Sequence, residues 1–300
     1  MPPPLHLVVV GGNGFIGSAV CRRALAKGFR VTSISSSGRP YRTPKGHTPA
    51  WTAQVDWRTG DALDPASYAE TLDGTSAVVH TLGTLLEDTE YKRALREGDA
   101  LGLLRAAFGN VNGRNPLAPK GTTTYERMNR DAALRVCEAF RDSPPPPAES
   151  KAATRPFVFI SAADVFRPWI DARYIETKRA AERGITEILA PHAERFRGAW
   201  STTPTHAPSL PPAAAFLDLT STLHVSLPAS LRSSLRAVVA DLPGRVNEHI
   251  PSPAASLATA LSTPPMHVDH VAAAAVQACL DPTIQGVLEK EEQGAAMQSV

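Results

Sequence analysis

The 300-residue sequence has few cysteines, few aromatic residues and almost no net charge. Its three cysteines, Cys21, Cys137 and Cys279, are widely spaced within helical patterns, so we expect buried free thiols rather than a disulfide or a metal site. Thirty-one basic and 29 acidic residues leave a formal charge of +2, which argues against a nucleic-acid partner. No apolar stretch approaches the roughly 20 residues that span a bilayer.

The sequence also has little room for a targeting segment. A predicted strand begins almost at Met1, so we expect no signal peptide or Arg-rich presequence ahead of it. An uncleaved internal signal stays open. These features favour the cytosol or an organelle matrix without separating the two.

The apolar run Leu5–Val10 passes directly into the glycine-rich string GGNGFIG. Gly11, Gly14 and Gly17 stand three residues apart: the first permits a tight turn, the second lets a pyrophosphate approach, and the third lets a helix pack close to the strand. The following stretch, Ser18–Lys27, has an amphipathic helical pattern, and Gly28 is placed to cap it. A strand, a glycine turn and a helix in this order predict a dinucleotide-binding site.

Short apolar strands and helices alternate through the first half of the chain. This alternation predicts an α/β fold with a Rossmann-like, doubly wound parallel sheet and right-handed crossovers. We expect a binding domain over residues 1–190 and, over 191–300, a smaller lobe whose helices pack on that core. The expected further strands are Phe29–Ser35, Trp51–Trp57, Ala77–Leu82 and Pro156–Ser161, and the expected further helices are Pro65–Leu72, opened by Asp64, and Arg127–Arg141.

Three segments read as loops, namely Glu87–Thr124, Ser143–Thr154 and Ser201–Pro212. Leu227–Leu242 has a helical apolar face, which fits a packed lobe helix or a membrane- or partner-binding helix. Asp269 is expected to cap a helix over Val271–Leu280, with His267 and His270 as ordinary polar neighbours.

The cofactor type is indicated by residues after the second and third strands. Ser36 and Arg39 follow the second strand where an acidic residue would bind the ribose of NAD, so they favour the 2′-phosphate of NADP. Asp61, followed by Ala62, can accept a hydrogen bond from the adenine amine or serve as a turn residue.

Tyr174 and Lys178 form a second constellation, downstream of Ser161 at the end of the fifth strand. Their spacing of four places both side chains on one helix face. A lysine ammonium beside a phenol lowers the phenol pKa, which suits a general acid or base, and a serine hydroxyl can orient a carbonyl. The three residues predict a reductase or epimerase site.

These residues resemble the extended, atypical branch of the short-chain dehydrogenase/reductase superfamily. The strings GGNGFIGSAVCRRALAKGF, SISSSGRP, YERMNRDAA, YIETKRAAE and MHVDHVAAAAVQA are similar to a fungal mitochondrial subgroup of ubiquinone biosynthesis, which is related to the NAD(P)-binding accessory subunit of complex I. The resemblance implies a protein on the matrix side of the inner membrane, in peripheral contact with it, that binds NADP or NAD among other ubiquinone-biosynthesis proteins. The residues expected to bind the dinucleotide are Gly11, Gly14, Phe15, Ile16, Gly17, Ser36, Arg39, Asp61, Ala62, Leu82, Gly83, Asn129 and Lys178, and the expected catalytic residues are Ser161, Tyr174 and Lys178.

The sequence departs from that family at two places. Ser161-Ala162-Ala163 supplies one hydroxyl where active members have several. A sixth strand ending in an Arg-Pro-Gly turn is expected after the Tyr/Lys helix, but Glu187–Trp200 contains no recognisable apolar strand. Either the segment is lost or replaced, or the coding sequence is misassembled across an intron. We therefore expect binding to be retained and leave three roles open: quinone-assembly member, active enzyme, or complex I-type subunit.

Overall fold

A computed structural model describes residues 4–84, 124–147, 154–164, 172–201, 256 and 267–288. Within these ranges seven strands form one sheet, in the order β3-β2-β1-β4-β5-β6-β7, and every neighbouring pair is parallel. The order reverses beside β1, because β2 and β3 extend the sheet on one side and β4 to β7 on the other. The predicted α/β, Rossmann-like class is therefore confirmed.

The strands are β1 (His6–Val10), β2 (Arg30–Ser35), β3 (Val55–Thr59), β4 (Ala77–His80), β5 (Arg155–Ile160), β6 (Phe196–Ser201) and β7 (Gly286–Leu288). The helices are α1 (Phe15–Ala26), α4 (Ala132–Asp142), α5 (Ala172–Leu189) and α9 (Val268–Leu280). Short 3-10 segments are η1 (Ala50–Gln54), η2 (Pro65–Ser67), η3 (Ala69–Leu72) and η6 (Ala190–His192), and η5 (Glu126–Asp131) is a π-helix.

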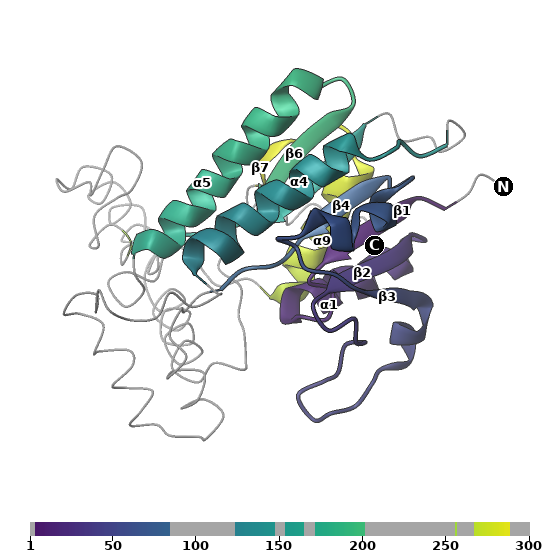
Figure 1. Cartoon of the computed structure of the whole chain (residues 1–300). Coiled ribbons are helices and arrows are strands. Elements are labelled where there is room, and N and C mark those ends of the chain that lie inside the picture. Colours follow the sequence, from purple (N-terminus) through teal and green to yellow (C-terminus); the bar gives the residue numbers. More distant parts are fainter. Residues whose placement is uncertain are drawn as a thin grey trace, which may run out of the picture.

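Helices cover both faces of the sheet (Figure 1). One apolar cluster joins α1 and α9 to one face, through strand residues such as Val9 and Val79. The other joins α4 and α5 to the opposite face, through the alternate residues Val8 and Val78. Because both faces are covered, the central strands are apolar throughout, which is why their sequences carry no alternating pattern.

The main correction concerns β6, the sixth strand that the sequence did not predict. Phe196–Ser201 pairs in parallel with the whole of β5, from Arg155 to Ile160. Its apolar pattern is interrupted by Arg197, which is buried and donates hydrogen bonds to the Ala278 carbonyl, at 2.5 Å, and to Thr154 Oγ1. Tertiary acceptors thus bond the two terminal nitrogens of a guanidinium group that is untypical of a buried strand, and the strand is present.

Local boundaries differ at several other elements. Trp51 lies in η1 rather than in a strand, and β3 begins at Val55. The helix expected over Pro65–Leu72 is two 3-10 turns, and Asp64 makes no side-chain cap bond. The helix expected over Arg127–Arg141 begins as the π-helix η5.

At α9, the capping residue is His267 rather than Asp269. The His267 ring nitrogen Nδ1 accepts a hydrogen bond from the Asp269 backbone N–H at 3.3 Å. Asp269 lies in the first turn and pairs with Arg22 of α1 at 2.5 Å. The pattern of residue types located the helix start but not the residue that caps it.

The predicted boundary at residue 190 stays a prediction. The described elements beyond it belong to the same sheet and its cover: β6 and β7 extend the sheet, and α9 packs on α1. The predicted Leu227–Leu242 helix and most of the loops 87–124 and 201–212 lie outside the described residues.

Gly17 is a packing glycine, so Gly17→Ala is expected to destabilise the fold. A Cβ atom there would lie 2.2 Å from the Gly11 carbonyl oxygen and 2.8 Å from Gly12 Cα, both backbone atoms that cannot swing aside. Overpacking of this kind costs about 1–3 kcal/mol, and urea denaturation measures it. Ala53→Val, which adds two carbons at an exposed site on η1, is the control and should leave the midpoint unchanged. Equal midpoints for Gly17→Ala and wild type would contradict the packing role.

Two buried histidines are expected to make the protein lose stability in mild acid. Burial lowers the pKa of His6 to about 4 and that of His80 to about 3, both below the ordinary value of 6.5. The unfolded chain therefore takes up protons first, and stability falls as pH drops below 6.5. Each histidine contributes a slope of about 1.4 kcal/mol per pH unit.

Urea denaturation between pH 6.5 and 4.5 tests this, since most carboxyls titrate lower, near about 4. His80→Phe should remove about half of the slope, because phenylalanine has no titrating group. The fold should survive, because the new ring can pack against Phe157 and Phe159 as the imidazole does. His47→Gln alters an exposed ring and should leave the slope intact. A wild-type stability that is flat over this range would rule out the effect.

Candidate functional site

The glycine turn between β1 and α1 has the geometry that a pyrophosphate needs. Gly11 has a φ of +87°, a region that favours glycine, and its backbone N–H donates to the Ile34 carbonyl at 2.8 Å. Gly14 is the N-terminal cap of α1, and no side chain bonds to the free N–H groups of the helix. A Cβ on Gly14 would have one described heavy atom within 4 Å, the Gly11 carbonyl oxygen at 3.2 Å. Over the described residues, little besides this oxygen lies near Gly14, at the N-terminus of a helix, and this arrangement fits an anionic group.

The loop after β2 lies against this turn. Asn13 Nδ2 donates to Ser37 Oγ at 3.1 Å, and the Arg39 N–H donates to the same oxygen at 3.3 Å. Ser36 and Arg39 are both exposed. The structure thus brings the two residues expected to favour NADP next to the glycine turn, with their side chains accessible, and their role stays a prediction.

Asp61 and Ala62 follow β3. The Asp61 carboxylate is exposed and accepts a hydrogen bond from the Leu63 N–H at 3.0 Å, while Ala62 is buried in the α4/α5 cluster. This bond is the ordinary turn interaction that the sequence allowed as the alternative to an adenine contact. Phe15, at the start of α1, is 36% exposed, and Ile16 is half-buried.

Lys178 joins α5 to the ends of two strands. Its Nζ donates to the Ile160 carbonyl at 2.9 Å and to the Leu82 carbonyl at 3.4 Å, and it lies 4.6 Å from the centre of the Phe159 ring. Burial lowers the pKa of Lys178 to about 7, and the Glu182 carboxylate opposes this shift. Such a lysine is held in place by backbone acceptors and needs little movement to donate to a ligand.

Lys178, Gly83 and Asn129 lie together. A Cβ built on Gly83 would be 2.9 Å from Lys178 Nζ and 3.1 Å from Asn129 Oδ1. The Leu82 side chain reaches the glycine turn, since its Cδ2 would be 2.8 Å from a Cβ on Gly11. Four of the predicted binding residues therefore lie together beside the glycine turn. They are Leu82 and Gly83 after β4, Asn129 in η5 and Lys178 in α5.

Asn129 is fully buried in the π-helix η5. Its Oδ1 accepts from the Thr84 N–H at 2.8 Å, and its Nδ2 donates to the Thr84 carbonyl at 3.1 Å. These two bonds fix the backbone just after Gly83. A π-helical turn, which is common at functional sites, places this amide at the sheet edge.

Ser161 is held by two residues that the sequence analysis missed. Its hydroxyl donates to Glu182 Oε1, and Glu182 also pairs with Arg179. Arg179 in turn donates to the Ala162 carbonyl at 3.0 Å. The signal that could have found Glu182 is its position, one helical turn after Lys178 on the same face of α5.

A second hydroxyl residue lies beside Ser161. The Ser161 N–H donates to the carbonyl of Ser201, the last residue of β6, at 2.9 Å. This contact is made by the backbone of β6, which the sequence did not predict. The register sets Ser201 opposite Ile160, whose side chain lies on the α1/α9 face of the sheet, so Ser161 stays the single hydroxyl of the two that faces α5.

Tyr174 lies on α5 with Lys178, as their spacing predicts, but the expected effect on its acidity is absent. Burial raises the pKa of Tyr174 to about 12, and the opposing influence comes from Arg179. The ring packs edge-on against Tyr125, with 6.0 Å between ring centres. The prediction that Lys178 lowers the Tyr174 pKa is wrong, because the Lys178 ammonium is directed to two carbonyl groups instead.

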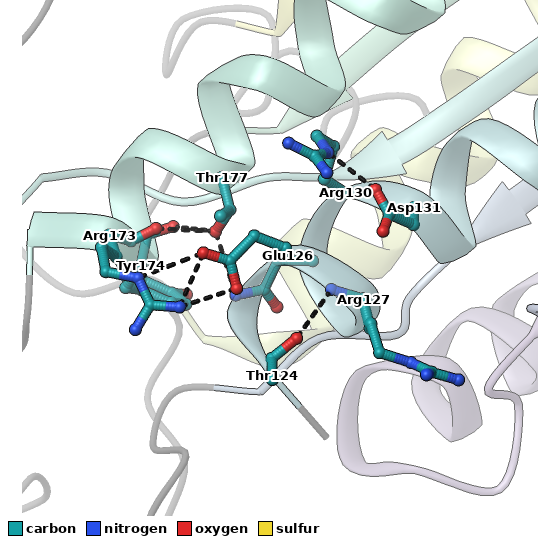
Figure 2. Close-up of polar contacts among 9 residues, drawn as sticks. Thr124, Glu126, Arg127, Arg130, Asp131, Arg173, Tyr174 and Thr177 are labelled. Atoms are coloured by element: carbon teal, nitrogen blue, oxygen red, sulfur yellow. Dashed lines mark hydrogen bonds and ion pairs between the residues drawn. The ribbon is translucent and has the colours of Figure 1, made fainter. Parts of the chain in front are cut away.

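An ion pair connects α5 to η5 (Figure 2). Arg173 Nη2 contacts both Glu126 carboxylate oxygens, at 2.6 and 2.7 Å, and Arg173 Nε donates to Glu126 Oε1 at 3.1 Å. Arg173 lowers the pKa of the Glu126 carboxyl. The pair holds the start of η5, with Tyr125, against the turn of α5 that carries Tyr174. Sequence reasoning could not find it, because the two residues are 47 positions apart.

Two further features bear on other kinds of site. Among the residues that the structure places, no group of three or more His, Cys, Asp or Glu side chains is arranged to hold a metal ion. Over the same residues, no helix has both the length and the apolar character needed to cross a bilayer.

Comparisons with known proteins identify a similar family model and similar sequences. Residues 7–107 match the model of the NAD dependent epimerase/dehydratase family. MIOREX complex component 2 of Saccharomyces cerevisiae is 35% identical over 180 residues, which are 59% of this chain and 65% of the yeast protein. An uncharacterised chloroplastic protein of Arabidopsis thaliana is 42% identical over 88 residues, which are 29% of this chain and 28% of that protein. The matched part therefore spans less than two thirds of each relative.

Solved structures agree on the fold. An oxidoreductase of the short chain dehydrogenase/reductase family from Burkholderia thailandensis has a TM-score of 0.52 at 18% identity, covering 95% of this chain and 90% of its own. The aldohexose dehydrogenase of Thermoplasma acidophilum has a TM-score of 0.53 at 13% identity, covering 95% and 91%.

The matching family is described as NAD dependent, and NAD or NADP is the cofactor that fits the glycine turn and its surroundings. The helix N-terminus at Gly14 and the polar cluster around Lys178 fit such a cofactor. Residues 7–107 are thus similar to the NAD dependent epimerase/dehydratase family, and the chain has a Rossmann-like fold like that of the short chain dehydrogenase/reductase from Burkholderia thailandensis.

Proposed function

We propose that this protein binds NADP(H) or NAD(H) as a member of a mitochondrial protein assembly, and that binding rather than rapid turnover is its main role. The observation that carries the proposal is the meeting of two halves of one site. The glycine turn offers free N–H groups at the start of α1, and Lys178, Gly83 and Asn129 lie beside it. Phosphates would bind at the first half and the nicotinamide ribose at the second.

NADP(H) is the preferred form in this proposal. Ser36 and Arg39 are exposed beside the glycine turn and can contact a 2′-phosphate. A carboxylate that would repel this phosphate is missing from the segment Ser35–Arg39. Asp61 would contact the adenine, although its present bond is a local one.

The assembly is proposed from two relationships. The yeast relative is named as a component of the MIOREX complex, which supports protein partners and a mitochondrial location. The sequence motifs are similar to the fungal proteins of ubiquinone biosynthesis, so we propose the quinone-synthesis complex, on the matrix side of the inner membrane, as the assembly. A complex I-type role is the alternative, and copurification of respiratory subunits instead of quinone-synthesis proteins would favour it.

An active reductase or epimerase is the second candidate, favoured by Tyr174 and Lys178 on one face of α5. In that role the bound nicotinamide would exchange a hydride with the substrate, Tyr174 would exchange a proton and Lys178 would hold the ribose. The state of Ser161 argues against an active reductase or epimerase, because its hydroxyl donates to Glu182 and not toward a ligand.

Gly14→Val is expected to abolish nucleotide binding while the fold survives. The Gly14 backbone has an ordinary φ of −81°, so the added side chain needs the Gly11 carbonyl oxygen, 3.2 Å from the new Cβ, to shift only slightly, and it occupies the side where the pyrophosphate would lie. Titration of purified protein with NADPH and NADH, followed by nucleotide fluorescence, should show tighter binding of NADPH by wild type and at least tenfold weaker binding by the variant. Ala53→Val is the matched control. Failure of the wild type to bind either nucleotide would refute the proposal.

Tyr174→Phe separates binding from catalysis. It removes one hydroxyl group and keeps the ring against Tyr125, so nucleotide affinity should stay within about twofold. In cells that depend on this chain, the quinone level should persist with Tyr174→Phe and fall with Gly14→Val. If both variants lower the quinone level equally, the protein is an enzyme that uses the Tyr174 hydroxyl.

A further inference from the structure

The turn after β5 is held by α5 at three consecutive residues. Lys178 donates to the Ile160 carbonyl at 2.9 Å, Glu182 accepts the Ser161 hydroxyl, and Arg179 donates to the Ala162 carbonyl at 3.0 Å. Two of these interactions share a link, because Arg179 also pairs with Glu182. Ser161, Glu182, Arg179 and Ala162 thereby close a ring of hydrogen bonds and ion pairs.

The direction of the Ser161 hydrogen bond follows from which of the side chains involved can donate a proton and which can only accept one. Arg179 is a permanent cation, and the group that pairs with it is a carboxylate, which accepts hydrogen bonds and donates none. A serine hydroxyl has one proton and two lone pairs. Since the hydroxyl donates that proton in its hydrogen bond to Glu182, Ser161 has only acceptor capacity left for a ligand. Ser161 and Glu182 are 7% and 9% exposed, so water competes little for this bond.

We propose that Glu182 is a positioning residue that fixes Ser161 as a hydrogen-bond acceptor at the carboxyl edge of the sheet. A ligand group that meets Ser161 must then bring its own proton, as an alcohol, a phenol or an N–H group does. A carbonyl oxygen cannot be held by this serine unless Glu182 releases it. The predicted class of ligand depends on the proposed nucleotide site, whereas the hydrogen bond between Ser161 and Glu182 does not depend on it.

Among the residues that the structure describes, the charged and titratable groups around Ser161 do not offer the Glu182 carboxylate a better partner. Lys178 is directed to backbone carbonyls, and His80 on β4 is kept neutral because burial lowers its pKa to about 3. Glu182 is therefore the group that sets the state of the Ser161 side chain, with Arg179 as its counter-ion.

Replacing the Ser161 hydroxyl with a thiol tests the contact with Glu182 without any ligand, because the thiol pKa responds to the negative charge of the carboxylate. In Ser161→Cys, a thiolate would face the Glu182 carboxylate, so the thiol pKa should rise about one pH unit or more above its ordinary value of about 8.5. The ultraviolet absorbance of the thiolate, taken as the difference from wild type across a pH titration, measures it. The three native thiols titrate above the range expected for the new thiol, because burial raises the pKa of each, to about 12 for Cys21 and Cys279.

The double variant Ser161→Cys/Glu182→Gln removes the negative charge and keeps the shape. Its thiol pKa should fall by about one pH unit or more relative to Ser161→Cys, a shift that a merely structural Glu182 would not cause. Ser161→Cys/Glu187→Gln, altered at an exposed glutamate of the same helix, is the matched control and should titrate like Ser161→Cys. If Glu182→Gln disrupts folding, adding Arg179→Gln removes the unpaired cation, and the fall should remain.

Equal thiol pKa values in Ser161→Cys and in Ser161→Cys/Glu182→Gln would overturn the proposal, as would an unshifted pKa in Ser161→Cys. The titration is made on nucleotide-free protein, and NADPH binding is measured separately on the same samples. A normal titration with no NADPH binding would refute the proposed function and the ligand class while supporting the hydrogen bond. Normal binding with an unchanged titration would refute only the role of Glu182.

Discussion

The site depends on one interaction, the contact of the Lys178 ammonium with the carbonyls that end two strands. It joins α5 to the Ile160 carbonyl of the β5 end and to the Leu82 carbonyl beyond β4, and it lies against Gly83 and Asn129. A buried ammonium without such acceptors would be strongly unfavourable, so the position of α5 and the shape of the sheet edge are tied together. The same contact explains why Lys178 does not act on Tyr174.

The two halves of the proposed site are built in different ways. The phosphate half is local: a strand, three glycines and a helix start, all within residues 6–26. The nicotinamide half is assembled from β4, η5, β5 and α5, which are far apart in the chain. It also uses charged pairs, Glu126 with Arg173 and Glu182 with Arg179, to fix η5 and the turn after β5. A site of this kind can retain its binding geometry while the group that would orient a substrate is engaged elsewhere, as Ser161 is.

The sequence predicted the local features well. The glycine turn, the placement of Tyr174 and Lys178 on one helix, and the parallel sheet all follow from short patterns whose period or spacing has a direct geometric meaning. It failed at β6, where Arg197 breaks the apolar pattern and donates hydrogen bonds to Ala278 and Thr154, 81 and 43 positions away. It also failed at the start of α9, because Asp269 pairs with Arg22 across 247 positions and the cap passes to His267.

The sequence by itself therefore determined the fold class, the nucleotide turn and the residues that face the site from single elements, because each depends on neighbours within one or two turns of chain. Only the tertiary structure decided which of these residues meet and in what state. Burial set the Tyr174 pKa high and the Lys178 pKa low, strand pairing brought the Ser201 carbonyl to the Ser161 N–H, and Glu182 accepted the hydrogen bond of the Ser161 hydroxyl. These outcomes depend on desolvation and on contacts between distant elements, which no local pattern records.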